Sequence, residues 1–264
     1  MALDISIPDT PTARIIESAT RRFADFGFDD TSLRDIASEA GVNAALINYY
    51  FRSKAVLYRE VVVLSVKRLA ESRVEMLDKL EREGNGKPIP VEVLLAATSG
   101  PVFAESQIPG TDRRAYIKFL SRLFTDPGPE TISVLFGGLT ELRERVLGLL
   151  CLALPHVPRK ELAWRYLFLS GSVHFTAGQI GYVEVISKGQ CSSTNLNEAL
   201  ASLIAAQSAM LSAPAVNAGH RALVKKFCKT PVLAPTKSLK RVDAASSSAK
   251  KVSPKASSKP FKGS

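Results

Sequence analysis

Residues 31–54, TSLRDIASEAGVNAALINYYFRSK, constrain the fold more than any other part of this chain. Leu33, Ile36 and Ala37 have the spacing of one buried face of a short helix. Gly41 follows four residues after Ala37, where a tight turn between two helices requires a positive φ. The stretch therefore predicts two short helices joined by a glycine turn.

The second of these helices is expected to separate an inner face from an outer one. Asn43 is placed to cap its first turn. The inward positions at i, i+4 spacing are Leu46, Ile47, Tyr50 and Phe51. The side chains left to point outward are Ala44, Ala45, Asn48 and Tyr49. A second helix that exposes small and hydrogen-bonding groups is typical of a helix-turn-helix that enters the major groove of DNA. The alternative is a helical hairpin with a solvated outer face.

Helical periodicity continues along the chain, and no alternating β pattern of useful length interrupts it. We therefore predict an all-α fold. The expected helices cover residues 11–26, 32–40, 44–51, 54–83, 91–98, 112–124, 130–153, 159–185 and 195–211.

The positive charge is concentrated at the C-terminus. The chain carries a formal net charge of +10, and residues 219–264 hold 12 Lys and Arg against one acid, which is +11. The remainder therefore carries 10 − 11 = −1. Residues 214–264 are rich in Lys, Ser, Ala and Pro, which predicts a disordered basic tail. This tail is either a solubilising appendage or a mobile polycation that adds sequence-independent affinity for DNA.

Several classes of protein are not indicated. The three cysteines are scattered, which favours a reducing compartment such as the cytoplasm. The N-terminus lacks a signal-peptide pattern, and no run reaches the roughly 18 apolar residues of a membrane span. We find no phosphate-binding loop or catalytic motif, and the three histidines lie far apart. We therefore expect no catalytic residues, no metal, no cofactor and no membrane partner.

Residues 13–61 closely resemble the DNA-binding segment of TetR-family transcriptional regulators. The resemblance is carried by ARIIESATRRFADFGFDDTSLRDIA, by the turn AGV and by the cluster NYYFRSKAVLY. The matching positions are Phe23, Gly27, Thr31, Ile36, Ala37, Gly41, Val42, Tyr49, Tyr50, Phe51, Lys54 and Leu57.

The resemblance implies a domain organisation and a function. After a flexible start at residues 1–10, residues 11–56 would form a three-helix helix-turn-helix domain. A long helix would join it to a helical ligand-binding and dimerisation domain at residues 57–213. The protein would be a bacterial, nucleoid-associated homodimer that binds an inverted-repeat operator in double-stranded DNA, most simply a repressor released by a small hydrophobic effector. A largely non-specific, tail-driven architectural protein is the alternative.

The resemblance also assigns DNA contacts. Thr31 and Ser32 would meet phosphate through their hydroxyls and the helix N-terminus. Tyr49 would touch phosphate and sugar, and Lys54 would be a phosphate-binding lysine. The base-facing positions are Asn43, Ala44, Ala45 and Asn48. Arg34 is a base-reading candidate whose alternative is an ion pair with Asp30. The two alanines depart from the longer polar groups of many relatives and offer only methyl contacts, so direct readout would depend on Asn48 and Arg34.

Two further sets of residues are expected in the second domain. Gly171 and Gly178, seven residues apart, suggest close approach by another helix. In the family this would be the dimer interface, made by the helices at residues 159–185 and 195–211. His174 lies between them and is interpreted as an interface or core residue rather than a metal ligand. An apolar effector pocket, or alternatively ordinary core packing, would involve Phe103, Tyr116, Phe119, Phe124, Phe136, Trp164 and Phe168.

Overall fold

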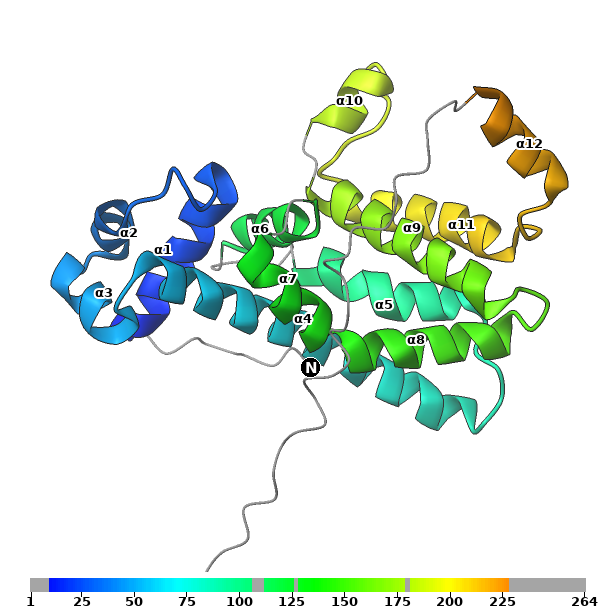
Figure 1. Ribbon diagram of the computed structural model, residues 1–264, viewed down its shortest axis with the longest axis horizontal. Helices are drawn as coiled ribbons and strands as arrows, with labels where there is room; N and C mark the ends of the chain where they lie inside the picture. Colours follow the sequence, from blue (N-terminus) through cyan, green and yellow to red (C-terminus); the bar gives the residue numbers. More distant parts are fainter. Residues whose placement is uncertain (1–9, 106–111, 126–127, 179–180, 228–264) are drawn as a thin grey trace, which may run out of the picture.

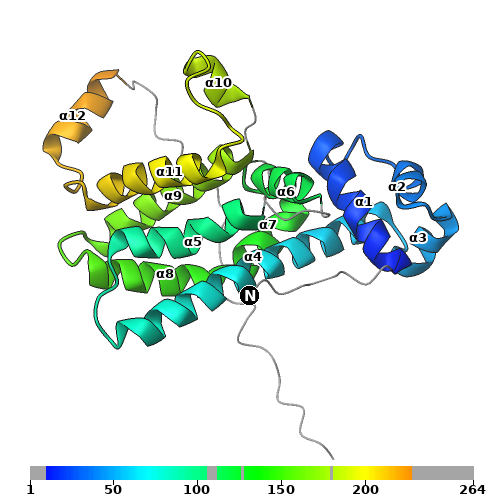
Figure 2. The same cartoon turned by 180° about the vertical axis from the view of Figure 1, so that it is seen from behind.

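The computed structural model describes residues 10–105, 112–125, 128–178 and 181–227. Within these ranges every regular element is a helix and none is a strand, which confirms the predicted all-α fold. The helices form a small lobe at one end and a larger helical body at the other, and one long helix runs from the first into the second (Figures 1 and 2).

The small lobe contains three helices, each begun by a polar capping residue, of which Asn43 is the one predicted above. Thr10, Ser32 and Asn43 cap them, and each side-chain oxygen accepts a hydrogen bond from a backbone N–H two or three residues ahead. The three helices pack around a core that includes Phe23 and Ile36. Their bounds are α1 (Pro11–Phe26), α2 (Leu33–Ala40) and α3 (Ala44–Phe51).

Helix α4 (Lys54–Gly84) links the lobe to the body. Ser53 caps it, and its 31 residues make a rod of about 46 Å. Leu57 is buried at the end that packs on the lobe, and Leu77 is buried at the end that packs in the body. Any displacement of α4 in the body is therefore carried to the lobe.

The body is a bundle around α4. Its core includes Leu94, Phe119 and Leu150. The expected helix at residues 130–153 is divided at Leu139, which follows two glycines, both poor helix formers. The remaining helices of the bundle are α5 (Val91–Glu105), α6 (Arg113–Thr125), α7 (Pro129–Gly138), α8 (Thr140–Ala153), α9 (Arg159–Gly178) and α11 (Leu196–Ser212).

Two short helices stand apart from the bundle (Figure 1). The expected helix at residues 159–185 is wrong in its last turns, because Gly181 has φ +80° and a separate helix α10 (Tyr182–Ile186) begins after it. The tail expected to be disordered from residue 214 contains α12 (Ala218–Phe227), none of whose side chains is buried. Residues 1–9 and 228–264, which include most of the predicted tail, lie outside the described residues.

Candidate DNA-binding surface and effector site

The predicted glycine turn is present between α2 and α3. Gly41 adopts φ +63° and ψ 38°, and its N–H bonds back to α2. The Val42 N–H donates to the Ala37 carbonyl at 3.0 Å, which closes the turn. On α3, Ile47 and Phe51 are buried in the lobe core. The turn and these two anchors hold α3 so that its opposite side faces solvent.

The outer face of α3 differs in two positions from the sequence expectation. Asn43, Ala45, Asn48 and Tyr49 are exposed as predicted, and Tyr49 reaches 79%. Ala44, which we expected to point outward, is partly buried against the core. Tyr50, which we expected to point inward, is half-exposed, and its ring packs edge-on against that of Tyr49 at 5.3 Å between centroids. We call the exposed residues, which are Asn43, Ala45, Asn48, Tyr49 and Tyr50, the recognition surface.

The start of α2 does not offer the two hydroxyls that the sequence suggested. Thr31 is only 2% exposed, and its hydroxyl donates to the Gly27 carbonyl at 2.7 Å, so this hydroxyl is already bonded within the lobe and its phosphate contact stays a prediction. Ser32 is exposed, but its hydroxyl donates to the carboxylate of Asp35 at 2.6 Å. This hydrogen bond from Ser32 keeps the pKa of Asp35 below its usual value. The helix N-terminus therefore already faces a carboxylate of its own chain.

Arg34 lies on the exposed side of α2. The ion pairs of the lobe join Arg21 and Arg22 to acidic partners, and among the described residues none joins Arg34 to Asp30. The alternative interpretation of Arg34 as half of that ion pair is therefore not realised. Its guanidinium extends from the same lobe as the recognition surface.

Lys54 has a different role from the predicted phosphate contact. Its ammonium donates to the carbonyls of Phe28 at 2.9 Å, Asp29 at 3.2 Å and Thr31 at 3.0 Å. It also lies 4.5 Å from the centroid of the Phe28 ring. A lysine has three donors, and three carbonyls of the α1–α2 loop receive them. Lys54 thus ties the start of α4 to this loop instead of presenting its protons to a phosphate.

Arg52 is a cation that the sequence analysis missed. It ends α3 with φ +61° and ψ −34°, a backbone conformation unusual for any residue except glycine, and its side chain is exposed. Its N–H donates to the Asn48 carbonyl at 3.0 Å, which holds it directly after the recognition surface. The signal was available in the sequence, because a basic residue stands between α3 and the Ser53 cap of α4.

The aromatic residues proposed for a pocket do not converge on one cavity. Phe103, Tyr116 and Phe119 are core residues. Phe124 stacks on His174, while Phe136, Trp164 and Phe168 are about half exposed at the surface. Tyr116 borders a hollow of about 400 Å³ between α1, α4 and α6, and the other members of this set are core or surface residues.

The interior of the body contains a smaller cavity between α4, α5, α8 and α9. Its volume is about 20 Å³, which is room for about one water molecule. Leu142, Val146 and Leu169 give it apolar walls. The hydroxyl of Ser99 is fully buried without a hydrogen-bond partner among the described residues, and it lines the same space. Burial raises the pKa of Tyr166, another polar group on the cavity wall, so that its phenol stays protonated.

The three residues proposed for the dimer interface have three different surroundings. Gly171 is exposed, and a Cβ placed there would meet nothing within 4 Å. Gly178 instead faces α6 of the same chain, where a Cβ would collide with Ser121. His174 is 1% exposed and stacks on Phe124 at 3.8 Å between ring centroids. Gly178 and His174 therefore lie in the contact between α9 and α6 of the same chain, which matches the core alternative for His174 and leaves Gly171 as the residue of this set that is open to a partner.

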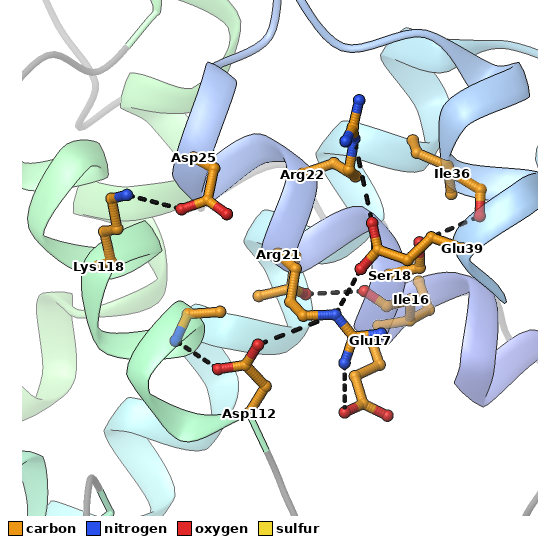
Figure 3. A network of polar contacts seen from close by, with 12 residues as sticks. Ile16, Glu17, Ser18, Arg21, Arg22, Asp25, Ile36, Glu39, Asp112 and Lys118 are labelled. Carbon is orange, nitrogen blue, oxygen red and sulfur yellow. Dashed lines mark hydrogen bonds and ion pairs between the residues drawn. The ribbon is translucent and has the colours of Figure 1, made fainter.

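Helix α6 also connects the body to the small lobe (Figure 3). Lys118 of α6 pairs with Asp25 of α1 at 2.6 Å. Asp112, directly before α6, lies 3.8 Å from Arg21, which in turn pairs with Glu39 of α2. The orientation of the lobe on the body is thus fixed by ion pairs as well as by apolar packing.

Family models match both parts of this architecture. The model described as "Bacterial regulatory proteins, tetR family" matches residues 15–61, from α1 into α4. The model described as "Tetracyclin repressor-like, C-terminal domain" matches residues 96–210, from α5 to α11. The chain belongs to the TetR family of transcriptional regulators. The resemblance inferred from the sequence is confirmed, while α12 and the basic tail lie beyond both TetR-family matches.

Individual relatives agree with this assignment. The probable HTH-type transcriptional regulator YttP of Bacillus subtilis (strain 168) is 49% identical over 49 residues, which are 19% of this chain and 24% of that protein. The chain thus matches about a quarter of this curated relative's length.

Solved structures of TetR-family proteins share the fold over most of the chain. A TetR-like transcriptional regulator from Rhodococcus sp. RHA1 superposes with a TM-score of 0.52 at 18% identity, over 77% of this chain and 97% of that one. The TetR family regulator PfmR from Thermus thermophilus gives 0.52 at 16% identity, over 75% and 97%. Within the described residues, no helix combines the length and the apolarity of a membrane span, and no three metal-binding side chains gather.

Proposed function

We propose that this TetR-family regulator is a homodimeric, sequence-specific repressor that a small hydrophobic effector releases from its operator. The observation that carries the proposal is the recognition surface, a two-turn helix face held outward by Ile47 and Phe51. Its size and position suit insertion into the major groove. The operator would be an inverted repeat in double-stranded DNA, because a two-fold dimer presents two such faces.

Base readout would depend on Asn48, which is exposed and able to pair with adenine in a bidentate manner. Asn48→Ala is expected to relax preference at one base pair per half-site by about 1–3 kcal/mol. The test is a fluorescence-anisotropy titration against operator variants changed one base pair at a time. An unchanged ranking of the variants would remove Asn48 from direct readout.

The dimer would form through α9 and α11, and α9 carries several large exposed apolar side chains. On α9 the stripe of Trp164, Leu167, Phe168, Gly171 and Phe175 recurs every three or four residues, and each of its members is exposed. An apolar surface of this kind on a bacterial regulator is suited to a partner subunit.

Gly171→Leu tests the interface cleanly, because the new side chain meets nothing in its own chain. Replacing a helical glycine also tends to stabilise the helix. Weaker dimerisation in sedimentation equilibrium, with unchanged helicity, would therefore come from a clash with the partner. A variant that dimerises as tightly as the parent would exclude Gly171 from the interface.

The effector site is proposed in the body interior, where Leu142, Val146, Leu169 and Val173 share a cavity wall with Arg73, Ser99 and Tyr166. A molecule larger than water requires this cavity to expand, and the displacement would reach the lobe through α4 and α6. A panel of apolar compounds tested for release of labelled operator DNA would identify the effector. Ser170→Val, which adds about the bulk that this cavity holds without widening it, should then weaken release while leaving operator affinity unchanged.

The basic tail favours a second candidate, a largely non-specific architectural protein. Parallel salt titrations with operator and with random DNA separate the two functions. The repressor predicts an affinity ratio of roughly 10³ or more. Equal affinities at every salt concentration would favour the architectural function.

A further inference from the structure

Residues 181–195, which precede α11, carry exposed apolar side chains on a hydrogen-bonded backbone. We define the α10 arm as residues 181–195. Val185 is 73% exposed and Ile186 is 65% exposed, and the ring of Tyr182 is also more than half exposed. Side chains of this kind are normally buried when their backbone is held in place, and a cluster of them at the surface indicates an interaction site.

Internal hydrogen bonds give the α10 arm its shape. The Glu184 carboxylate accepts from the hydroxyl of Ser193 at 2.8 Å and from the same residue's N–H. The backbone bond from Ser193 keeps the pKa of Glu184 below its usual value, so this group is a carboxylate at neutral pH. Gly181 N–H donates to Ser193 Oγ at 3.2 Å, and Cys191 N–H donates to Ser187 Oγ at 3.0 Å. Such preorganisation lowers the entropy cost of binding.

The arm continues the apolar stripe of α9. The ring of Tyr182 packs edge-on against that of Phe175, with 6.5 Å between centroids. Next to this contact lies a hollow of about 420 Å³ between α9, α10 and α11, whose lining includes Leu196 and Leu203. The arm therefore presents the protruding side chain of Val185 beside a mostly apolar hollow, and Ile186 of the same arm forms part of the wall of that hollow.

The two-fold symmetry of a dimer determines where the α10 arm and the hollow of each copy would lie. Two lobes that bind one DNA duplex must lie at the same end of the dimer, so the two-fold axis runs from that end along the α9 and α11 face. Equivalent residues of the two copies lie at the same distance from the DNA, and those on this face lie opposite each other across the axis. The α10 arm lies nearer to the small lobe than α12 does in both views (Figures 1 and 2). Each arm would consequently meet the same region of the other copy.

We infer that the α10 arm is a reciprocal clasp, in which Val185 of one copy packs into the hollow between α9, α10 and α11 of a second copy of this chain, against the Ile186 that lines that hollow. The inference rests on the dimer proposed above. The contact is self-complementary, as a two-fold interface requires, because each copy supplies one arm and one hollow.

Two other occupants suit the arm less well. DNA is disfavoured because the exposed tip is apolar and the arm contains the carboxylate of Glu184. Helix α12 of the same chain leaves from the opposite end of α11, which separates it from the hollow (Figure 1). A second copy offers an aliphatic side chain to a hollow whose wall is mostly apolar, with Glu198 as its one acidic lining residue among the described residues.

Sedimentation equilibrium of the full chain tests the clasp. A Val185→Asp/Ile186→Asp double variant should raise the dimer dissociation constant by about 30-fold or more, because it would place two charges in an apolar contact. Ser202→Phe, which fills the hollow from an exposed position on its wall, should weaken the dimer in the same direction. Met76→Asp is the matched control, because Met76 is an exposed apolar residue of α4. Circular dichroism should show equal helicity in all of them.

The outcomes separate the clasp from the dimer itself. If Gly171→Leu weakens the dimer while the double variant stays within twofold of the parent, the clasp is wrong and the α9 interface stands. If neither changes dimerisation, both assignments are wrong. A benzophenone amino acid at Val185 should also give a covalent dimer under ultraviolet light, and the same probe at Met76 should not. If neither probe gives a covalent dimer, the clasp is contradicted.

Discussion

At the scale of single residues, Arg52 combines a backbone conformation that favours glycine with an exposed cation beside the recognition surface. Arg52→Gly should leave the free energy of unfolding unchanged or raise it by up to about 1 kcal/mol, because strain is relieved while chain entropy is lost. It should also reduce the slope of log affinity against log salt by about one unit, for one lost phosphate contact. Denaturant unfolding and anisotropy across a salt series measure both. An unchanged slope would show that Arg52 does not touch DNA.

Unlike Arg52, Lys54 is expected to contribute to folding stability more than to DNA affinity. Lys54→Met would leave the carbonyls of Phe28, Asp29 and Thr31 without their donor. We predict a loss of roughly 1–3 kcal/mol in unfolding free energy. Operator affinity measured well below the melting temperature should fall much less than folding stability. Wild-type stability combined with a large, salt-dependent loss of affinity would restore the phosphate role that the resemblance implied.

His174 makes the stability of the body depend on pH. Burial, with a smaller contribution from the charge of Arg73, holds its pKa well below the ordinary value. Below about pH 6.5 the His174 side chain is protonated in the unfolded chain but stays neutral in the folded chain. The free energy of unfolding therefore falls as pH falls, by up to about 1.4 kcal/mol per pH unit. Above that pH the side chain is neutral in both states, and this loss of stability is absent. His174→Leu should flatten the curve of unfolding free energy between pH 7 and pH 5, and an unaltered curve would contradict the assignment.

At the scale of elements, α6 is the part of the body whose ion pairs reach α1. Lys118→Ala breaks the exposed pair with Asp25 and should cost less than about 1 kcal/mol of stability. Operator affinity should nevertheless fall, because the lobes would be held less firmly at the spacing of the half-sites. Arg145→Ala is the matched control, since Arg145 joins α8 to Asp78 of α4 within the body. Equal effects of the two variants on DNA binding would show that α6 does not position the lobe.

Most helices could be predicted from sequence because their signals are local. Caps such as Thr10 and Ser53, the turn at Gly41 and the spacing of apolar residues depend on neighbours a few positions away. The failures occur where a backbone signal is weak. The break before α10 depends on the positive φ of Gly181. Helix α12 was missed because its short apolar pattern, which ends at Phe227, lies in a segment that resembles a disordered tail.

The site was predicted less completely, because spacing shows which side of a helix a residue occupies but not what it contacts. Thr31 and Lys54 stand where the resemblance places phosphate contacts, yet both are bound by the α1–α2 loop. Gly178 could be identified as a point of close approach, but the approaching helix is α6 of the same chain. Contacts between elements far apart in sequence require the assembled fold.

At the scale of the whole molecule, charge is divided between a nearly neutral body and a basic C-terminal segment. Removing residues 237–264, which lie outside the described residues, should lower affinity for operator and for random DNA by similar factors. The loss should be largest at low salt, because each phosphate neutralised adds about −0.9 to the salt slope. Anisotropy titrations of full-length and truncated protein measure the effect. Parallel lines of equal slope would mean that the tail serves solubility alone.

The small cavity in the body would limit how fast an effector can bind. A chamber with room for about one water molecule cannot admit an apolar effector until the surrounding helices separate. The rate of effector uptake would then level off at the rate of this opening as effector concentration rises. Motions of this type take microseconds to seconds. A regulator built in this way would respond to a sustained rise in effector and ignore a brief one.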